Sequence, residues 1–272
     1  MDYSGFLNFA SNLAMEAGAF LKRFRGEGHL DIQAKVAGLD FVTNADKTAQ
    51  KMIFESIAAT YPDHGFIGEE DGLGNDGARA LLRDGAERLF WVVDPLDGTL
   101  NYIRGLNGYS VSIALVRGTK PVVGVVYAPV EDELYSACEG GGAFKNGMPI
   151  SASDCRDIHN ALIIPSVPLT DMDLRDKMLA INSRLSRITL NTRIFGSAAV
   201  EISHVAHAGV DAYFEYGIYP WDVAAGVIIA REAGAIASSL DGREYELGDP
   251  GILVSAEGIH MAMVEAIGFD GK

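Results

Sequence analysis

The chain has 272 residues, of which 48% are hydrophobic, so it can bury a substantial core either as one large domain or as two closely packed halves. Acidic residues outnumber basic ones by 37 to 22, which gives a formal net charge of −15, and no basic cluster is longer than the group Lys22, Arg23 and Arg25. Binding to a phosphate backbone needs a basic face, so the composition excludes nucleic acid as a main partner.

The first third of the chain alternates helices with short strands. Apolar residues spaced three and four apart predict an amphipathic helix over residues 4–25. The segment "LDFVTNAD" predicts a short strand that closes at Asn44, and the following segment predicts a second helix that stops before Pro62. We interpret the glycine-rich, charged stretch 72–87 as a surface loop with room for one turn of helix.

Residues 89–144 carry the pattern of an antiparallel meander, with the strands "LFWVVD", "YSVSIALVRG", "KPVVGVVYAPV" and "ELYSAC". Strands and helices then alternate again. We expect strands at 161–166, near Ile188, at 210–216 and at 251–255, and helices at 171–185, from Ser197, from Trp221 and at the C-terminal end. The prediction is an α+β protein with an N-terminal α+β half (1–150) and a C-terminal α/β half (151–272) in one compact unit, because no linker separates the halves.

The cysteine content and the hydropathy bear on the compartment. Cys138 and Cys155 form neither a disulfide framework nor a CxxC motif, so a reducing compartment is expected. No segment reaches the roughly 20 apolar residues that span a bilayer. We therefore expect a cytoplasmic protein without a membrane partner.

In the segment "WVVDPLDGTLNY" an apolar, strand-like run is followed by two carboxylates. Asp94 and Asp97 repel each other unless a cation lies between them, and their three-residue offset lets both converge if a turn or helix begins there. Pro95 fixes the backbone, Gly98 permits close approach of a ligand, and Thr99 adds a hydroxyl group. The alternative interpretation is that Asp94 caps a helix and the second aspartate is part of a simple turn.

Three further acidic residues stand at strand ends or helix starts. Glu69 lies in "GEED", which could equally be a solvated acidic loop, and Asp222 lies in "YPWDVAAG", where it could be a helix cap. Asp46 closes "FVTNAD". If the fold brings these residues to Asp94 and Asp97, the result is an all-oxygen cluster that selects Mg²⁺ or Mn²⁺, with Ca²⁺ as the weaker alternative.

The motifs "GEE", "WVVDPLDGTLNY" and "WDVAAG" occur in this order, with "DFVTNAD" upstream and "GSAAVEISHVAHAGVDAYFEYG" before the last one. Together they resemble the inositol monophosphatase family of Mg²⁺-dependent, lithium-sensitive phosphatases, and the resemblance covers essentially the whole chain. It implies a layered α-β-α-β-α fold, a homodimer, and hydrolysis of a small phosphorylated metabolite.

The resemblance also implies a set of metal ligands. Glu69 and Asp94, with the carbonyl of Leu96, would hold the first Mg²⁺, whereas Asp94, Asp97 and Asp222 would hold the second. Some members bind a third, weaker Mg²⁺ near Glu69, and Mn²⁺ can substitute. Most of these ligands belong to the half 1–150, and the half 151–272 adds Asp222 and substrate contacts.

The catalytic and substrate-binding residues follow from the same resemblance. Thr99 and Asp46 resemble the pair that helps Glu69 to orient the attacking water. The metals would acidify that water, neutralise the phosphate charge and stabilise the leaving alkoxide in an in-line displacement. The implied substrate contacts are Asp97, Gly98, Thr99, Ala198, Glu215 and Asp222.

The physiological substrate is the open part of the prediction. Inositol monophosphate is favoured, and the alternatives are histidinol phosphate, fructose 1,6-bisphosphate and NADP(H), or a regulatory role through protein binding. A Ca²⁺-binding structural module is a third reading. We interpret His204 and His207 as ordinary helix positions and "GGGAF" as a tight turn, because neither has the partners that a metal site or a phosphate loop requires.

Overall fold

The structure is a computed structural model that describes residues 2–28, 30–36, 40–85, 88–165 and 171–269. Its helices are α1 (Ser4–Gly26), α2 (Asn44–Thr60), α3 (Gly74–Asp84), α4 (Thr99–Arg104), α5 (Met172–Leu185), α6 (Ala198–Ala206), α7 (Pro220–Glu232) and α8 (His260–Ile267). Its strands are β1 (Ile32–Val36), β2 (Asp40–Thr43), β3 (Gly65–Gly68), β4 (Leu89–Asp97), β5 (Ser110–Arg117), β6 (Lys120–Ala128), β7 (Glu133–Cys138), β8 (Ala143–Lys145), β9 (Met148–Pro149), β10 (Leu162–Pro165), β11 (Asn191–Thr192), β12 (Ala212–Tyr216), β13 (Ile236–Ser238) and β14 (Gly251–Ser255).

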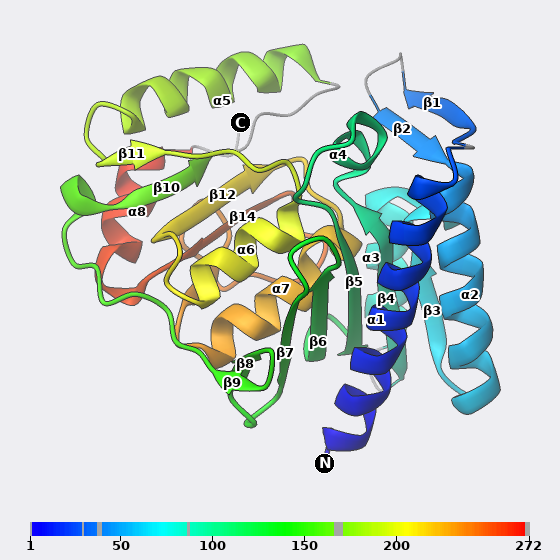
Figure 1. Ribbon diagram of the computed structural model, residues 1–272. Coiled ribbons are helices and arrows are strands. Elements are labelled where there is room, and N and C mark those ends of the chain that lie inside the picture. Colours follow the sequence, from blue (N-terminus) through cyan, green and yellow to red (C-terminus); the bar gives the residue numbers. More distant parts are fainter. Residues whose placement is uncertain (1, 29, 37–39, 86–87, 166–170, 270–272) are drawn as a thin grey trace.

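Two large sheets alternate with three layers of helices, and β1 and β2 form a separate two-stranded antiparallel sheet (Figure 1). The seven-stranded sheet has the order β3-β4-β5-β6-β7-β8-β9, and the five-stranded sheet has the order β11-β10-β12-β14-β13. Helices α1 and α2 cover the outer face of the larger sheet, α6 and α7 lie between the sheets, and α5 and α8 cover the outer face of the smaller sheet. The expected layered α-β-α-β-α fold is confirmed. The division into halves at residue 150 stays a prediction.

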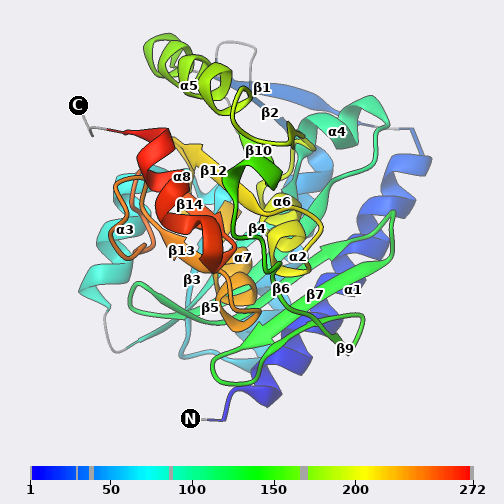
Figure 2. The ribbon, with the colours of Figure 1, turned by 90° about the vertical axis from the view of Figure 1, so that its left-hand side faces the viewer.

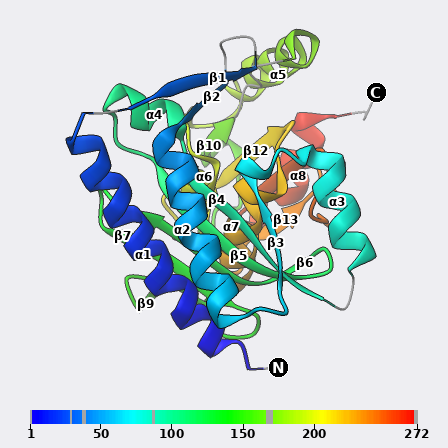
Figure 3. The same cartoon turned by 90° about the vertical axis from the view of Figure 1, so that its right-hand side faces the viewer.

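Helices α1 and α2 lie side by side on the larger sheet (Figure 3). Helix α1 presents a stripe of small and apolar residues that includes the buried Ala10, Ala14 and Leu21. Gly18 allows its close approach, because a Cβ there would lie 2.5 Å from the ring of Tyr127 on β6. Within the described residues no helix is long and apolar enough to cross a membrane.

Strand β4 is apolar on both faces because helices cover both faces of the sheet. Trp91 and Val93 point into the cluster with α1 and α2, whereas Phe90 and Val92 point into the cluster between the sheets. The strand pairs antiparallel with β5, and β6 and β7 continue the ladder, so the predicted meander is confirmed. Strand β3 adds to its other edge in parallel.

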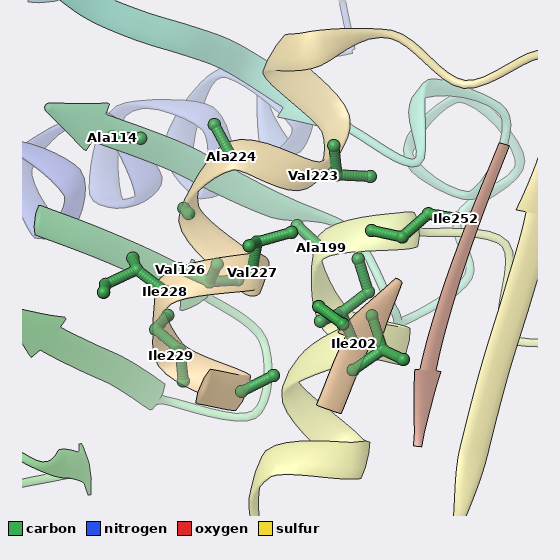
Figure 4. Packing of buried hydrophobic residues seen from close by; sticks show 14 of the residues in the cluster. Ala114, Val126, Ala199, Ile202, Val223, Ala224, Val227, Ile228, Ile229 and Ile252 are labelled. Carbon is green, nitrogen blue, oxygen red and sulfur yellow. The ribbon is translucent and has the colours of Figure 1, made fainter. Parts of the chain in front are cut away.

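The middle helical layer packs tightly against both sheets. Ile202 of α6 and Val223 and Val227 of α7 lie in one cluster with Ile252 of β14 (Figure 4). Gly226 permits the contact between the two helices, since a Cβ there would lie 2.8 Å from Ile202. This packing fixes the N-terminal ends of α6 and α7 beside the end of β4.

The outer face of the smaller sheet carries α5 and α8 (Figure 2). Met178 of α5 and Met263 of α8 share a buried cluster with Phe214 of β12. The strand expected near Ile188 begins instead at Asn191, because Ile188 belongs to the turn that ends α5 and its N–H bonds to the carbonyl of Leu185. The short strands β1, β8, β9 and β13 were not predicted.

The predicted surface loop at 72–87 is wrong, because this segment contains the helix α3 of 11 residues. Its glycines disfavour a helix, but tertiary contacts offset them. Ala78 and Leu82 are buried in the cluster between the sheets. Arg79 forms an ion pair with Asp249 at 3.3 Å, and Asn75 donates a hydrogen bond to the carbonyl of Ile218 at 3.0 Å.

Candidate active site

The end of strand β4 carries a β-bulge between Asp94 and Asp97. Asp94 pairs with Ser112, but Asp97 pairs with Ser110, so three steps on β4 match two steps on β5. In a regular strand, residues three apart point to opposite faces of the sheet. The bulge changes this alternation and lets both carboxylates face one region.

Asp94 is almost completely buried at the end of β4. Its Oδ1 accepts a hydrogen bond from the Leu96 N–H at 2.9 Å. Burial raises the pKa of the Asp94 carboxyl well above its ordinary value, and the charges of Glu69, Asp97 and Asp222 raise it further. The fold therefore brings these four predicted ligands within electrostatic reach of one another.

Asp97 is held by the start of α6. Its Oδ2 accepts hydrogen bonds from the Ser197 hydroxyl at 2.5 Å and from the Ala199 N–H at 2.8 Å. Burial raises the pKa of Asp97 to about 6, while these hydrogen bonds, and those from the N–H groups of Ala198 and Gly98, act to lower it. Asp97 thus joins β4 to the first turn of α6.

Asp222 lies in the first turn of α7. Its Oδ2 accepts the Tyr219 N–H at 3.0 Å, so the helix-cap interpretation is correct for this residue. The same carboxyl also faces the acidic cluster: burial raises its pKa first, followed by the charges of Glu69, Asp97 and Glu215. Asp222 can therefore cap α7 and contribute to the acidic cluster at the same time.

Glu69 begins the short 3₁₀ helix Glu69–Asp71 that follows β3. The turn is fixed by Asp71, whose Oδ2 accepts the Gly68 N–H at 2.9 Å, and by Gln50, whose Oε1 accepts the Glu70 N–H at 3.0 Å. Gln50 in turn donates to Asp71 Oδ1 at 3.0 Å. These bonds place Glu69 at the edge of the cluster rather than in a free acidic loop.

The charge balance of the cluster suits a hard cation. In the described part of the chain, no lysine or arginine forms an ion pair with Asp94, Asp97 or Asp222. Their donor atoms are all oxygens, which are the ligands that Mg²⁺ prefers. Among the same described residues, however, no group of three or more His, Cys, Asp or Glu side chains has the geometry of a preformed metal site.

Thr99 connects Asp46 to the end of β4. Its Oγ1 lies 3.0 Å from the Leu96 carbonyl oxygen and 3.3 Å from Asp46 Oδ1. The other oxygen of Asp46 accepts from the N–H and the hydroxyl of Thr43, as the capping box of α2. Burial raises the pKa of Asp46 and the Thr43 hydrogen bonds act against this. The structure thus brings Asp46, Thr99 and Leu96 together.

Gly98 lies where three segments meet. Its φ is +85°, and a Cβ there would lie 2.9 Å from the carbonyl oxygen of Gly108 and 3.1 Å from that of Gly196. Only glycine fits this position without strain. Of the other predicted substrate contacts, Ala198 is the first residue of α6 and its N–H bonds to Asp97, and the charge of Glu215 on β12 raises the pKa of Asp222.

Two residues that the sequence did not single out hold the loop before α6. Glu201 Oε1 accepts the N–H groups of Phe195 at 2.5 Å and Gly196 at 2.9 Å. Asn101 Nδ2 donates to the carbonyls of Phe195 and Gly108, each at 2.7 Å. Glu201 is the one carboxyl on the mostly apolar helix α6, and this was the feature of the sequence that could have indicated its role.

His204 and His207, which the sequence analysis set aside, lie at the C-terminal end of α6, and the ring of His204 packs against that of Phe195 with centroids 5.0 Å apart. The rings of His204 and His207 contact each other in a tilted arrangement with centroids 5.0 Å apart, and burial lowers the pKa of both. The glycine run forms the turn between β7 and β8, where Glu232 accepts the N–H groups of Gly140 and Gly142, each at 2.9 Å. A carboxylate of the chain itself therefore fills this turn.

A family model, curated relatives and a solved structure all match this chain over most of its length. A sequence model of the inositol monophosphatase family matches residues 2–269. Inositol-1-monophosphatase of Mesorhizobium japonicum is 34% identical over 268 residues, which cover 98% of this chain and 97% of that protein. Nus factor SuhB of Pasteurella multocida is 37% identical over 237 residues, 87% of this chain and 85% of that protein. The crystal structure of extragenic suppressor protein suhB from Bartonella henselae superposes with a TM-score of 0.87 at 31% identity, covering 97% of this chain and 98% of that one.

Proposed function

Because the chain belongs to the inositol monophosphatase family and is therefore a phosphatase, we propose that it hydrolyses inositol monophosphate with the help of Mg²⁺. The observation that carries the proposal is the convergence of buried carboxylates at the bulged end of β4, where the charges of neighbouring acidic residues raise the pKa values of Asp94 and Asp222. Such a cluster is unfavourable without a cation and suits a hard divalent metal.

The proposed ligands divide into two sets that share Asp94. Glu69, Asp94 and the Leu96 carbonyl would hold one Mg²⁺, and Asp94, Asp97 and Asp222 would hold a second, with a third in some states of the enzyme. The support is that these side chains interact electrostatically and that their donors are oxygens. Mn²⁺ would fit the same donors.

Bound metal would acidify the attacking water and neutralise the charge of the phosphate. The remaining steps fall to the chain. We propose that Glu69, with Thr99 and Asp46, orients the water and takes up its proton, and that the Thr99–Asp46 contact keeps the hydroxyl aimed. The N–H groups of Gly98 and Thr99, at the start of α4, would bind phosphate oxygens.

The alcohol part of the substrate would meet Ala198, Glu215 and Asp222. The relative named inositol-1-monophosphatase, which aligns with almost the whole chain, favours inositol monophosphate. Histidinol phosphate, fructose 1,6-bisphosphate and NADP(H) remain the alternatives within the same chemistry.

The test is phosphate release, with and without Mg²⁺, from inositol 1-phosphate, histidinol phosphate, fructose 1,6-bisphosphate, NADP and 3′-phosphoadenosine 5′-phosphate. The proposal predicts the highest kcat/KM for inositol 1-phosphate and inhibition by lithium. A higher value for another ester would reassign the substrate. No release from any of them by protein that binds Mg²⁺ would overturn the proposed activity.

A second candidate function is a regulatory role through protein binding, and the relatives named Nus factor SuhB are the observation that favours it. The experiment is size-exclusion chromatography of this protein with purified bacterial RNA polymerase and Nus factors. Co-elution that persists in an Asp94→Asn variant would separate binding from catalysis. Independent elution would overturn the regulatory role and leave phosphatase activity as the proposed function.

We also propose a cytoplasmic homodimer. The free thiols of Cys138 and Cys155 suit a reducing compartment. Leu106, Leu190 and Ile194 are exposed apolar side chains that a second copy would cover. Sedimentation equilibrium decides between monomer and dimer, and a Leu190→Glu variant would shift a dimer toward monomer.

A further inference from the structure

The segment Phe195–Ser197 forms one wall of the candidate site. Ser197 donates to Asp97 at 2.5 Å, and the backbone at Ala199 donates to the same oxygen at 2.8 Å. The carbonyl of Gly196 lies 3.1 Å from the position that a Cβ on Gly98 would take. The wall therefore contacts both a proposed metal ligand and the proposed phosphate-binding turn.

Side chains, rather than a helix or strand, hold this wall in place. Phe195 lies between β11 and α6, outside both. Its N–H bonds to Glu201 Oε1 at 2.5 Å, and its carbonyl accepts from Asn101 Nδ2 at 2.7 Å. Glu201 also accepts the Gly196 N–H at 2.9 Å, and Asn101 also donates to the Gly108 carbonyl at 2.7 Å. The Phe195 peptide is thus gripped from α6 on one side and from α4 on the other.

The position of Glu201 is costly for a residue that serves packing alone. The side chain is 4% exposed. Burial raises its pKa to about 8, and Glu215 and Asp97 raise it as well. An apolar residue would fill the same volume without this penalty. The carboxyl instead accepts hydrogen bonds from two N–H groups of the wall.

We propose that Glu201 and Asn101 are positioning residues that fix the Phe195–Ser197 wall and thereby set how the enzyme discriminates between the alcohol parts of phosphate esters. The inference rests on the proposed function, because it concerns the same site. It assigns to these two residues no contact with the substrate. Ala198 follows the wall directly, so a shift of the wall moves the surface that the alcohol meets while the bulged end of β4 keeps its ladder with β5.

The experiment compares kcat/KM for inositol 1-phosphate with kcat/KM for 4-nitrophenyl phosphate, whose alcohol part offers no neighbouring hydroxyl. In Glu201→Leu and Asn101→Leu the ratio of the two values is expected to fall by about 10- to 100-fold, since a displacement near 1 Å has effects of this size. Glu201→Gln keeps an acceptor oxygen for the N–H groups of Phe195 and Gly196, so it should restore the ratio to within about twofold of wild type.

Glu232→Leu is the matched control, because Glu232 also accepts two N–H groups of a glycine turn, far from the site. Its ratio should equal that of wild type. Circular dichroism and the shift of Tm on adding Mg²⁺ are measured for each variant and should match wild type. If Glu201→Leu does not fold, Asn101→Leu on the partly exposed helix α4 decides.

A wild-type ratio in a folded Glu201→Leu or Asn101→Leu variant would overturn the inference, and so would an equal fall in Glu232→Leu. Wild-type protein that hydrolyses neither ester would overturn the proposed function and the inference with it. Wild-type protein that hydrolyses both, with unchanged ratios in the variants, would overturn the inference alone.

Discussion

Replacing Gly98 with alanine tests whether the meeting point of the three segments must stay as tight as the structure has it. A Cβ at Gly98 would lie 2.9 Å from the Gly108 carbonyl, 3.1 Å from the Gly196 carbonyl and 3.2 Å from the Ser197 Cβ. None of these atoms is the end of a flexible side chain, so the backbone itself must move. Gly105→Ala is the control, because Gly105 has a similar φ of +80° but its nearest neighbour is the end of a side chain, the Arg25 guanidinium, at 3.1 Å.

Both substitutions carry the cost of a left-handed conformation, about 1–2 kcal/mol. Gly98→Ala adds overpacking of about 1–3 kcal/mol, so its loss of unfolding free energy is expected to be roughly 2–5 kcal/mol. Displacement of the Gly196–Ser197 segment should also lower kcat/KM by about 10²-fold. Gly105→Ala should keep kcat/KM near wild type. The assays are urea unfolding and phosphate release, and the reasoning is refuted if the two variants lose equal activity or if Gly98→Ala loses none.

Three further predictions concern charge. Asp94→Asn removes a carboxyl whose pKa is raised by burial and by neighbouring acids, so calorimetry without metal should show a Tm no lower than that of wild type. The rise in Tm that Mg²⁺ causes in wild type should disappear in this variant. A retained rise would contradict the ligand role of Asp94. The pKa of Glu201 is about 8 in the folded state and 4.5 in the unfolded state. The free energy of unfolding of wild type should therefore fall relative to that of Glu201→Gln as the pH rises from about 4.5 to 8, by at most roughly 1.4 kcal/mol per pH unit. Parallel pH profiles of the two proteins would contradict the shift. Arg79→Leu leaves the buried Asp249 without its closest cation and should lower the free energy of unfolding in urea by about 1–3 kcal/mol. Arg83→Leu breaks the ion pair with Glu246, whose side chains are 53% and 56% exposed, and should lower it by less than about 1 kcal/mol. Equal losses in the two variants would contradict this difference.

The elements that could be predicted from sequence are those with a long, regular apolar pattern. Helix α1 and the strands of the meander have such patterns, and the structure has them at nearly the expected residues. Helix α3 could not be found this way, because its stability comes from contacts with residues far along the chain, such as Asp249 and Ile218. Strands of two or three residues, such as β9 and β13, leave too short a pattern to read.

The acidic cluster could be anticipated because its members share a chemical type and stand at strand ends or helix starts. How Asp94 and Asp97 come to face one region could not, since the β-bulge between them has no signature beyond Pro95. The roles of Glu201 and Asn101 depend on hydrogen bonds to a backbone segment that only the folded chain brings near. Such partners become visible only when the whole topology is known.

The most direct test of the account is phosphate release from inositol 1-phosphate by the wild-type protein, first stripped with EDTA and then supplied with Mg²⁺ or with Ca²⁺. We expect no turnover after EDTA, recovery with Mg²⁺ and none with Ca²⁺, because an all-oxygen cluster of this kind would use Mg²⁺ to activate the attacking water. Turnover that persists after complete removal of the metal would contradict the central claim that the carboxylates at the end of β4 act through a bound cation.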